Sequence, residues 1–221
     1  MYRDEQIIRL LNYKNLLYQL LKLGFVKVFS DNLADSLGFS ASLVRKDFNA
    51  FGIKGNQKGG YFIQDILSRI AKILGKSETQ KVILVGVGNI GSALLHYSGF
   101  RKENIQIVAG FDLDTHRHRP KADIPILPVD QISAFTEKQQ IRIAIMAVPE
   151  MAAQQTIELL HKAGIRGILN FSSLNLRSKK ELQIHQINIG PELENLIYQV
   201  NYNIQQENTQ TIKKEEKVWN A

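Results

Sequence analysis

Cysteine is absent from the 221-residue sequence, which excludes disulfide bonds, thiolate metal sites and cysteine catalysis. Also missing is any apolar run close to the roughly 20 residues that a membrane-spanning helix needs. Residues 1–5 are charged and lead directly into an amphipathic pattern, which is not the pattern of a secretory signal peptide. These absences lead us to expect a cytoplasmic protein with no membrane partner and no bound metal ion.

Positive charge is concentrated in the first third of the chain. The formal net charge is +7, and residues 1–75 hold 11 Lys and Arg against 6 Asp and Glu. Residues 76–221 are nearly balanced, with 17 against 15. Such a local excess is typical of a segment that binds a polyanion, although a basic balance often reflects only a solvated surface.

The first third has the pattern of one long helix followed by two short helices and a turn. Apolar residues recur at helical spacing over 5–23. A second segment starts at Ser30, which we expect to be its N-cap, and turns at Gly38. Ser40 then fits the N-cap of a third helix. This order predicts a helix-turn-helix motif.

The third helix carries polar side chains of the kinds that read DNA. Ser42, Arg45, Lys46 and Asn49 lie on the faces that its apolar residues leave over. In this motif the helix enters the major groove, where Arg or Lys can bind guanine and Asn can bind adenine. We predict that these four residues contact DNA. The alternative from these residues alone is a small helical domain with a solvated charged face.

Residues 52–63 favour the DNA-binding interpretation. They hold four glycines, two lysines and one asparagine between extended apolar ends. We predict a hairpin with a basic tip, which is the wing of a winged helix-turn-helix domain. Lys54 and Lys58 would contact phosphates or the minor groove. A fourth helix is expected over 64–74, and 76–81 reads as a short polar linker.

A glycine-rich turn organises the second part of the chain. Residues 82–85 form an apolar run typical of a buried strand, and Gly86, Gly88 and Gly91 follow at the G-x-G-x-x-G spacing. In dinucleotide-binding folds these glycines permit a tight turn, approach of the backbone to a pyrophosphate, and close helix packing. The helix that follows adds free N–H groups. Alone the motif is weak, because glycine-rich turns are common.

Strands and helices alternate after this turn, which predicts a doubly wound parallel sheet. A helix is expected over 150–163. The apolar runs that we take as further strands are 105–111, 124–127, 141–148, 165–170 and 187–189.

Asp112 directly follows the strand expected at 105–111 and lies about 20 residues after Gly91, where a carboxylate can accept a hydrogen bond from a ribose hydroxyl. A carboxylate there favours NAD over NADP, although Arg117 and Arg119 leave NADP open. Ligands of such sheets bind beyond the carboxyl ends of the strands. The same positions could also hold ordinary loop residues. The residues that we predict to bind the cofactor from this turn and these strand ends are Gly86, Gly88, Asn89, Ile90, Gly91, Asp112, Val148, Pro149, Asn170 and Phe171.

Catalytic residues are not evident in this second part. It spans roughly 115 residues, about one ordinary domain, and leaves no separate substrate domain. None of the five histidines lies in a convincing acid–base setting. A sensor that binds DNA through one domain and a redox cofactor through the other therefore fits better than an enzyme. A compact NAD-dependent oxidoreductase and a regulator that senses another nucleotide stay open as alternatives.

A series of motifs then follows one order along the chain. They are VRKDF at 44–48 with FG at 51–52, GGY at 59–61, GVGNIGSAL at 86–94, YSGF at 97–100, FDLD at 111–114 and GILNF at 167–171. With these motifs the chain resembles the Rex family of redox-sensing transcriptional repressors, over about residues 5–206.

The resemblance implies a homodimeric repressor that senses the NADH/NAD⁺ ratio and is released from operator DNA by NADH. It also implies that Tyr97 lies near the nicotinamide, that Arg45 and Lys46 read the major groove, and that the wing enters the minor groove. Two departures concern the redox switch, because Asn15 and Asn188 stand where family members often carry Arg and Asp. With asparagine at both positions, the two charges are lost, and with them a charge-assisted hydrogen bond.

We therefore predict an α/β protein with four parts. A winged helix-turn-helix DNA-binding domain spans 1–75, and a Rossmann-type NAD(H)-binding domain with a doubly wound parallel sheet spans 76–190. A C-terminal helix over 191–206 would be swapped between the subunits of a dimer, and 207–221 would be a flexible tail.

Overall fold

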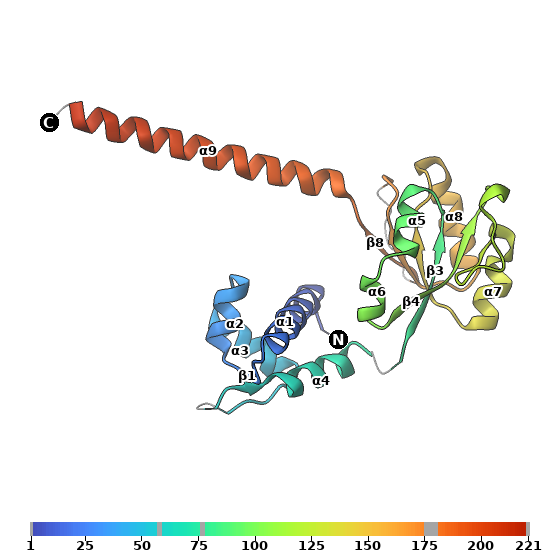
Figure 1. Ribbon diagram of the computed structural model, residues 1–221, viewed down its shortest axis with the longest axis horizontal. Helices are drawn as coiled ribbons and strands as arrows, with labels where there is room; N and C mark the ends of the chain where they lie inside the picture. Colours follow the sequence, from blue (N-terminus) through green and yellow to red (C-terminus); the bar gives the residue numbers. More distant parts are fainter. Residues whose placement is uncertain (1, 57–58, 76–77, 175–180, 220–221) are drawn as a thin grey trace. The chain divides into compact units, whose positions relative to one another are not determined.

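The computed structural model describes residues 2–56, 59–75, 78–174 and 181–219, and of 207–219 it describes the backbone only. Two compact units make up the chain, Met1–Gln80 and Lys81–Ala221 (Figure 1). In the part that the structure describes, no helix is both long enough and apolar enough to span a membrane. The same residues contain no group of His, Asp and Glu side chains that could hold a metal ion.

The described residues of the first unit form four helices and a two-stranded sheet, which confirms that the N-terminal part of the chain is mainly helical. Gly38 ends the second helix in the left-handed conformation (φ 68°) and turns the chain into the third helix. The described elements of this unit are α1 (Asp4–Lys22), β1 (Lys27–Val28), α2 (Ser30–Leu37), α3 (Ala41–Ala50), β2 (Tyr61–Phe62) and α4 (Ile63–Ile73).

One apolar core holds these helices together. Each helix contributes the residues that its periodicity places on one face, as α4 does with Ile63, Ile66 and Ile70. Aromatic rings fill its centre, where Phe48 of α3 packs edge-on against Tyr13 of α1. The four helices therefore share a single core, and α3 is anchored in it from its buried side.

The two serines predicted as N-caps behave differently. Ser40 caps α3, because its Oγ accepts the N–H of Leu43 at 3.2 Å. Ser30 does not cap α2; it is the first residue of that helix, and Phe29 stands at the N-cap position. The Oγ of Ser30 instead accepts a hydrogen bond from Nη1 of Arg45 at 2.9 Å, which links α2 to α3.

The hairpin predicted over 52–63 is present only at its tip, where Asn56 and Gly60 form an antiparallel bridge, and its second strand pairs outside this segment. Strand β2 pairs antiparallel with β1, which precedes α2 in the chain. Within 52–63 the described residues form one isolated bridge, between Asn56 and Gly60. The reason lies in Tyr61, whose ring packs against Phe48 at 4.9 Å between centroids and so directs β2 toward the helices. A pattern of glycines and lysines cannot reveal a partner strand 30 residues away.

The second unit contains a six-stranded sheet in the order β5-β4-β3-β6-β7-β8, which confirms the predicted doubly wound fold. Strands β4 and β5, β3 and β6, β6 and β7, and β7 and β8 pair in parallel. Its strands are β3 (Gln80–Val85), β4 (Ile105–Asp112), β5 (Ile126–Pro128), β6 (Ile143–Met146), β7 (Gly167–Asn170) and β8 (Gln183–Gln186). Its described helices are α5 (Asn89–Leu95), α6 (Gly99–Lys102), η1 (Thr115–Arg117), η2 (Val129–Gln131), α7 (Ile132–Gln139), α8 (Glu150–Lys162) and α9 (Ile189–Trp219).

Helices cover both faces of this sheet (Figure 1). Alternate residues of β3 point to opposite faces, so Ile83 belongs to the core under α7 and α8. Leu84 belongs to the other core, which Leu94 and Phe100 of α5 and α6 complete. Because β3 is buried on both sides, its sequence is a continuous apolar run instead of an alternating one.

The last predicted strand, at 187–189, is wrong. The strand at this edge is β8, and Ile189 already belongs to α9. In β8 the exposed Gln183 and His185 alternate with the half-buried Ile184 and Gln186, so the strand has no continuous apolar run. Apolar content alone therefore misplaced it.

The C-terminal helix is longer than the sequence pattern indicated. The sequence predicted a helix over 191–206 and a flexible tail over 207–221, whereas α9 continues to Trp219. Lys and Glu are common beyond 206 and are good helix formers, so the polar composition does not end the helix. Oδ1 of Asn188 accepts the N–H of Gly190 at 3.2 Å and caps its start. Every described side chain over 189–206 is exposed.

Candidate functional site

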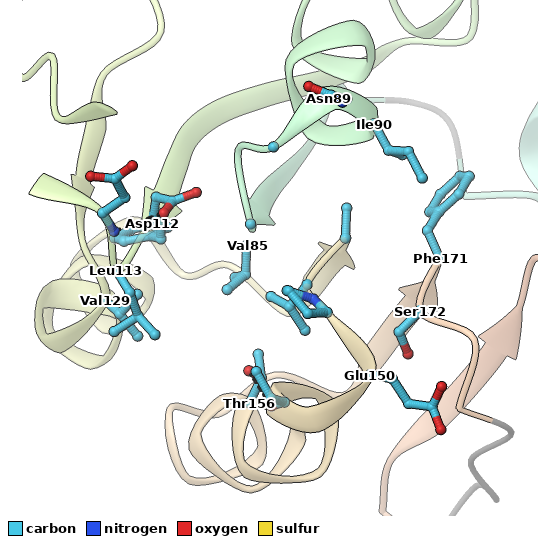
Figure 2. A pocket seen from close by; sticks show the side chains of 18 of the residues that line it. Val85, Asn89, Ile90, Asp112, Leu113, Val129, Glu150, Thr156, Phe171 and Ser172 are labelled. Carbon is cyan, nitrogen blue, oxygen red and sulfur yellow. Dashed lines mark hydrogen bonds between the residues drawn. The ribbon is translucent and has the colours of Figure 1, made fainter. Parts of the chain in front are cut away.

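A cavity of about 670 Å³ opens beyond the carboxyl ends of β3, β4, β6 and β7 (Figure 2). This volume is in the usual range for sites that bind small molecules and cofactors. Its position is the crevice where doubly wound sheets bind their ligands. The predicted cofactor residues that line it are Gly86, Gly88, Asn89, Ile90, Asp112, Val148, Pro149 and Phe171.

The glycine-rich turn forms the middle of the cavity wall, and two of its glycines are required by backbone contacts. Gly86 has a φ of 87°, and a Cβ on it would overlap the carbonyl of Ala147. A Cβ on Gly91 would overlap the carbonyl oxygen of Gly86 itself. Gly91 is buried behind the turn and does not line the cavity. At Gly88, by contrast, a Cβ would meet nothing nearer than 3.6 Å.

Asp112 holds this turn from the neighbouring strand. Its Oδ2 accepts the N–H of Val87 at 2.6 Å, and its Oδ1 accepts the N–H of Asp114 at 2.8 Å. Both oxygens of the carboxylate therefore accept backbone N–H groups. The residue also lines the cavity, where its remaining lone pairs can accept further hydrogen bonds. The structure thus adds a second task to the ribose contact that the sequence predicted for this residue.

Arg117 lies across the same turn. Its guanidinium donates to the carbonyl of Val87 and to Oδ2 of Asp114, the latter at 3.2 Å, and Nη1 is 4.0 Å from Oδ2 of Asp112. The pKa of Asp114 is lowered, mainly by the N–H of His116 and then by the hydrogen bond from Arg117. Arg117 is thus paired with Asp114 and lies close to the carboxylate of Asp112.

Two predicted cofactor residues lie elsewhere in this chain. Tyr97 is 59% exposed, packs edge-on against Phe100 and is not part of the cavity wall. Asn170 is fully buried beneath the wall. Its Oδ1 accepts the N–H of Ser172 at 2.9 Å, and its Nδ2 donates to Oε1 of Gln186 at 2.6 Å. Asn170 therefore positions the loop after β7 instead of facing the cavity.

The structure also brings residues into the cavity that the sequence analysis did not propose. Ala152 and Thr156 come from α8, one turn apart, so their i, i+4 spacing was a signal for a common face. Leu113 and Val129 lie beside Asp112 at one end of the cavity (Figure 2), and Asp114 also lines it. Leu113 and Asp114 belong to the FDLD motif that contains Asp112, whereas no local pattern marks Val129.

The candidate DNA-binding residues of α3 share one exposed face. Ser42, Arg45, Lys46 and Asn49 are all exposed, whereas Val44, Asp47 and Phe48 are buried. Lys54 is exposed as well, and Lys58 lies outside the described residues. Arg45 is held by the hydrogen bond to Ser30 and by an ion pair with Asp31 at 3.4 Å. The face is therefore accessible, with its central arginine oriented from α2.

A buried carboxylate fixes the back of α3. Asp47 accepts two hydrogen bonds from Arg9, at 2.6 and 2.7 Å, and a third from the hydroxyl of Tyr13 at 3.0 Å. The hydrogen bond to Asp47 raises the pKa of Arg9; burial raises the pKa of Tyr13, followed by its bond to Asp47. Leaving a buried charge without its partner costs about 3–5 kcal/mol, so this cluster holds α3 on α1 in one orientation.

Comparisons with known proteins bear on both units. A family model described as a CoA binding domain matches residues 77–174. The redox-sensing transcriptional repressor Rex of Desulforamulus reducens is 35% identical over 196 residues, which is 88% of this chain and 93% of that one. The Rex of Streptococcus thermophilus is 37% identical over 178 residues, 79% of this chain and 81% of that one. This chain belongs to the Rex family.

Solved structures agree with the Rex assignment over nearly the whole chain. RSP in complex with β-NAD⁺ and operator DNA matches with a TM-score of 0.85 and 28% identity, over 95% of this chain and 97% of that one. RSP in complex with β-NADH matches with a TM-score of 0.84 and the same identity, over 94% and 98%. The Rex family consists of transcriptional repressors, so this chain is a redox-sensing repressor and not an oxidoreductase.

Gly91 and Gly88 of the glycine-rich turn give a matched pair for a stability test. Gly91→Ala should lower the free energy of unfolding by about 2 kcal/mol or more, because the added methyl group would overlap a backbone carbonyl. Gly88→Ala should cost less than about 1 kcal/mol, because the site has room. Chemical denaturation of both variants measures the difference, and equal losses would contradict the packing described for the turn.

Proposed function

We propose that this chain binds operator DNA through its first unit and NAD(H) in the cavity of its second unit, and that NADH releases it from DNA. The observation that carries the proposal is the combination of an exposed basic face on α3 with a glycine-lined dinucleotide cavity, in a chain of the Rex family. The cytoplasm is the compartment that we propose for it.

The dinucleotide would span the cavity from one side of β3 to the other. The pyrophosphate would lie against the turn at Gly86 and Gly88, because glycines let the backbone approach the ligand closely. The adenosine ribose would lie at Asp112, and the nicotinamide at the opposite end, beside Val148 and Phe171. We propose NAD(H) over NADP(H) for two reasons. Arg117, which could bind a 2′-phosphate, is already paired with Asp114, and the carboxylate of Asp112 would repel that phosphate.

The DNA contacts that we propose divide into two kinds. Arg45, Lys46 and Asn49 would read base edges in the major groove, with Ser42 contributing near the start of α3. Lys54 and Lys58 would bind backbone phosphates, and such contacts add affinity for any DNA sequence.

We also propose that α9 is the dimerisation element and is exchanged between two copies of the chain. Leu193, Leu196, Ile197, Val200 and Ile204 repeat at helical spacing, and all five are exposed. A continuous apolar stripe of this kind in a folded chain needs a partner surface. A dimer also supplies the two recognition helices that paired half-sites require.

Ligand-controlled DNA release is the first prediction of this proposal. A duplex selected from a random pool by the wild-type chain serves as the operator. The affinity of the protein for this duplex is then measured at increasing concentrations of NADH, NAD⁺ or CoA. NADH should weaken binding about 5–150-fold, the range of ordinary allosteric coupling, and NAD⁺ should not. Equal effects of NADH and NAD⁺ would refute redox sensing, and release by CoA alone would refute the ligand assignment.

Removal of the central arginine tests the recognition helix. Arg45→Ala should weaken binding to the selected duplex by about 1–3 kcal/mol and reduce its preference over random DNA. Lys54→Ala should weaken both duplexes alike and lower the salt dependence. Arg101→Ala, which removes the same charge from the surface of the second unit, is the control. An Arg45→Ala variant with unchanged sequence preference would contradict the assignment of α3.

The exposed stripe of α9 predicts the oligomeric state. Ile197→Asp should convert the dimer into a monomer or weaken it strongly, because it places a charge within the apolar stripe. Gln199→Glu adds a charge on the polar side of the same helix and should leave the dimer intact. Sedimentation equilibrium distinguishes the two variants, and a dimer that survives Ile197→Asp would show that α9 is not the interface.

A further inference from the structure

One hydroxyl group at the wall of the cavity has no partner. Among the described residues, Oγ of Ser172 is the buried side-chain atom that makes no hydrogen bond. Ser172 is only 4% exposed, and it lines the cavity at the end of β7. A buried hydroxyl without a hydrogen bond costs free energy, and a ligand in the cavity would supply the missing partner.

The loop that carries this hydroxyl is held firmly by its backbone. The N–H of Ser172 donates to Oδ1 of Asn170 at 2.9 Å, and its carbonyl accepts from Nε2 of Gln186 at 2.6 Å. Nδ2 of Asn170 donates to Oε1 of Gln186 at 2.6 Å, which closes the ring of hydrogen bonds. Because both sides of the residue are tied to β7 and β8, its hydroxyl is preorganised and would lose little freedom on binding.

The charges at this end of the cavity favour a neutral polar group over an anion. Figure 2 shows Phe171, Ser172 and Glu150 together at one end, with Asp112 and Leu113 at the other. No side chain caps the start of α8, which would by itself attract an anion. Glu150, in the first turn of α8, already places a carboxylate there and would repel a second one.

We infer that the Ser172 hydroxyl hydrogen-bonds the carboxamide of the nicotinamide and makes this end of the cavity specific for it. The inference rests on the proposed NAD(H) function, because that proposal places the nicotinamide at the ends of β6 and β7. A carboxamide is neutral and offers both an acceptor oxygen and donor N–H groups, so it can satisfy a hydroxyl in either direction. The apolar side chains of Val148 and Phe171 border the same end and suit the flat ring.

The test compares ligands with and without the nicotinamide. Ser172→Ala removes the hydroxyl, and Ser133→Ala makes the same change on the exposed surface of α7 as a control. Isothermal titration measures the binding of NADH, NAD⁺ and ADP-ribose, which lacks the nicotinamide. We expect Ser172→Ala to weaken NADH and NAD⁺ about 3- to 10-fold, the effect of one neutral hydrogen bond, and to leave ADP-ribose unchanged. Ser133→Ala should change none of the three.

The ligand-free protein provides a second readout. Because the hydroxyl has no partner there, Ser172→Ala should leave the melting temperature unchanged or raise it, so weaker NADH binding would not reflect misfolding. Equal weakening of NADH and ADP-ribose, or no weakening of either, would overturn the inference. If the wild-type chain binds no NADH, the proposed function itself fails. If the wild-type chain binds NADH and Ser172→Ala binds it equally well, only the inference about Ser172 fails.

Discussion

The second unit depends on one close backbone contact, in which Gly91 of α5 lies against the carbonyl of Gly86. Because no side chain separates them, the helix starts directly behind the turn that ends β3, and Gly88 and Asn89 face the cavity. Asp112 then holds the turn from β4 through the N–H of Val87. A turn constrained from both sides can present its amide groups to a pyrophosphate without reorganising, which is what makes a binding site precise and tight.

A buried carboxylate has the corresponding role in the first unit. Asp47 faces inward from α3, and its bonds to Arg9 and Tyr13 of α1 fix the helix whose opposite face carries the candidate DNA contacts. A buried ion pair is weak evidence for net stability, since desolvation offsets its attraction. Its value here is geometric, because breaking it would leave a charge in an apolar core. DNA recognition needs such a fixed helix, since base contacts depend on distances of a few tenths of an ångström.

The sequence predicted the local elements of the site better than the residues and strands with which those elements pair. The glycine spacing, the position of Asp112 and the exposed face of α3 follow from short patterns, and the structure has them where expected. Asn170 was misjudged, because the sequence shows a polar strand end but not that its side chain turns inward to Gln186. The strand predictions were incomplete at 52–63 and wrong at 187–189, because a partner strand and an edge position are properties of the whole sheet.

The sequence by itself therefore determined the two-part organisation, the helix-turn-helix, the doubly wound sheet and the motif order of the Rex family. These depend on periodicity and on glycine geometry, which act over a few residues. Only the tertiary structure decided that Arg117 donates to the carbonyl of Val87, that Asn170 supports the wall and that the Ser172 hydroxyl is buried without a partner. Each of these facts joins residues from different strands and loops, and such distances arise when the sheet assembles.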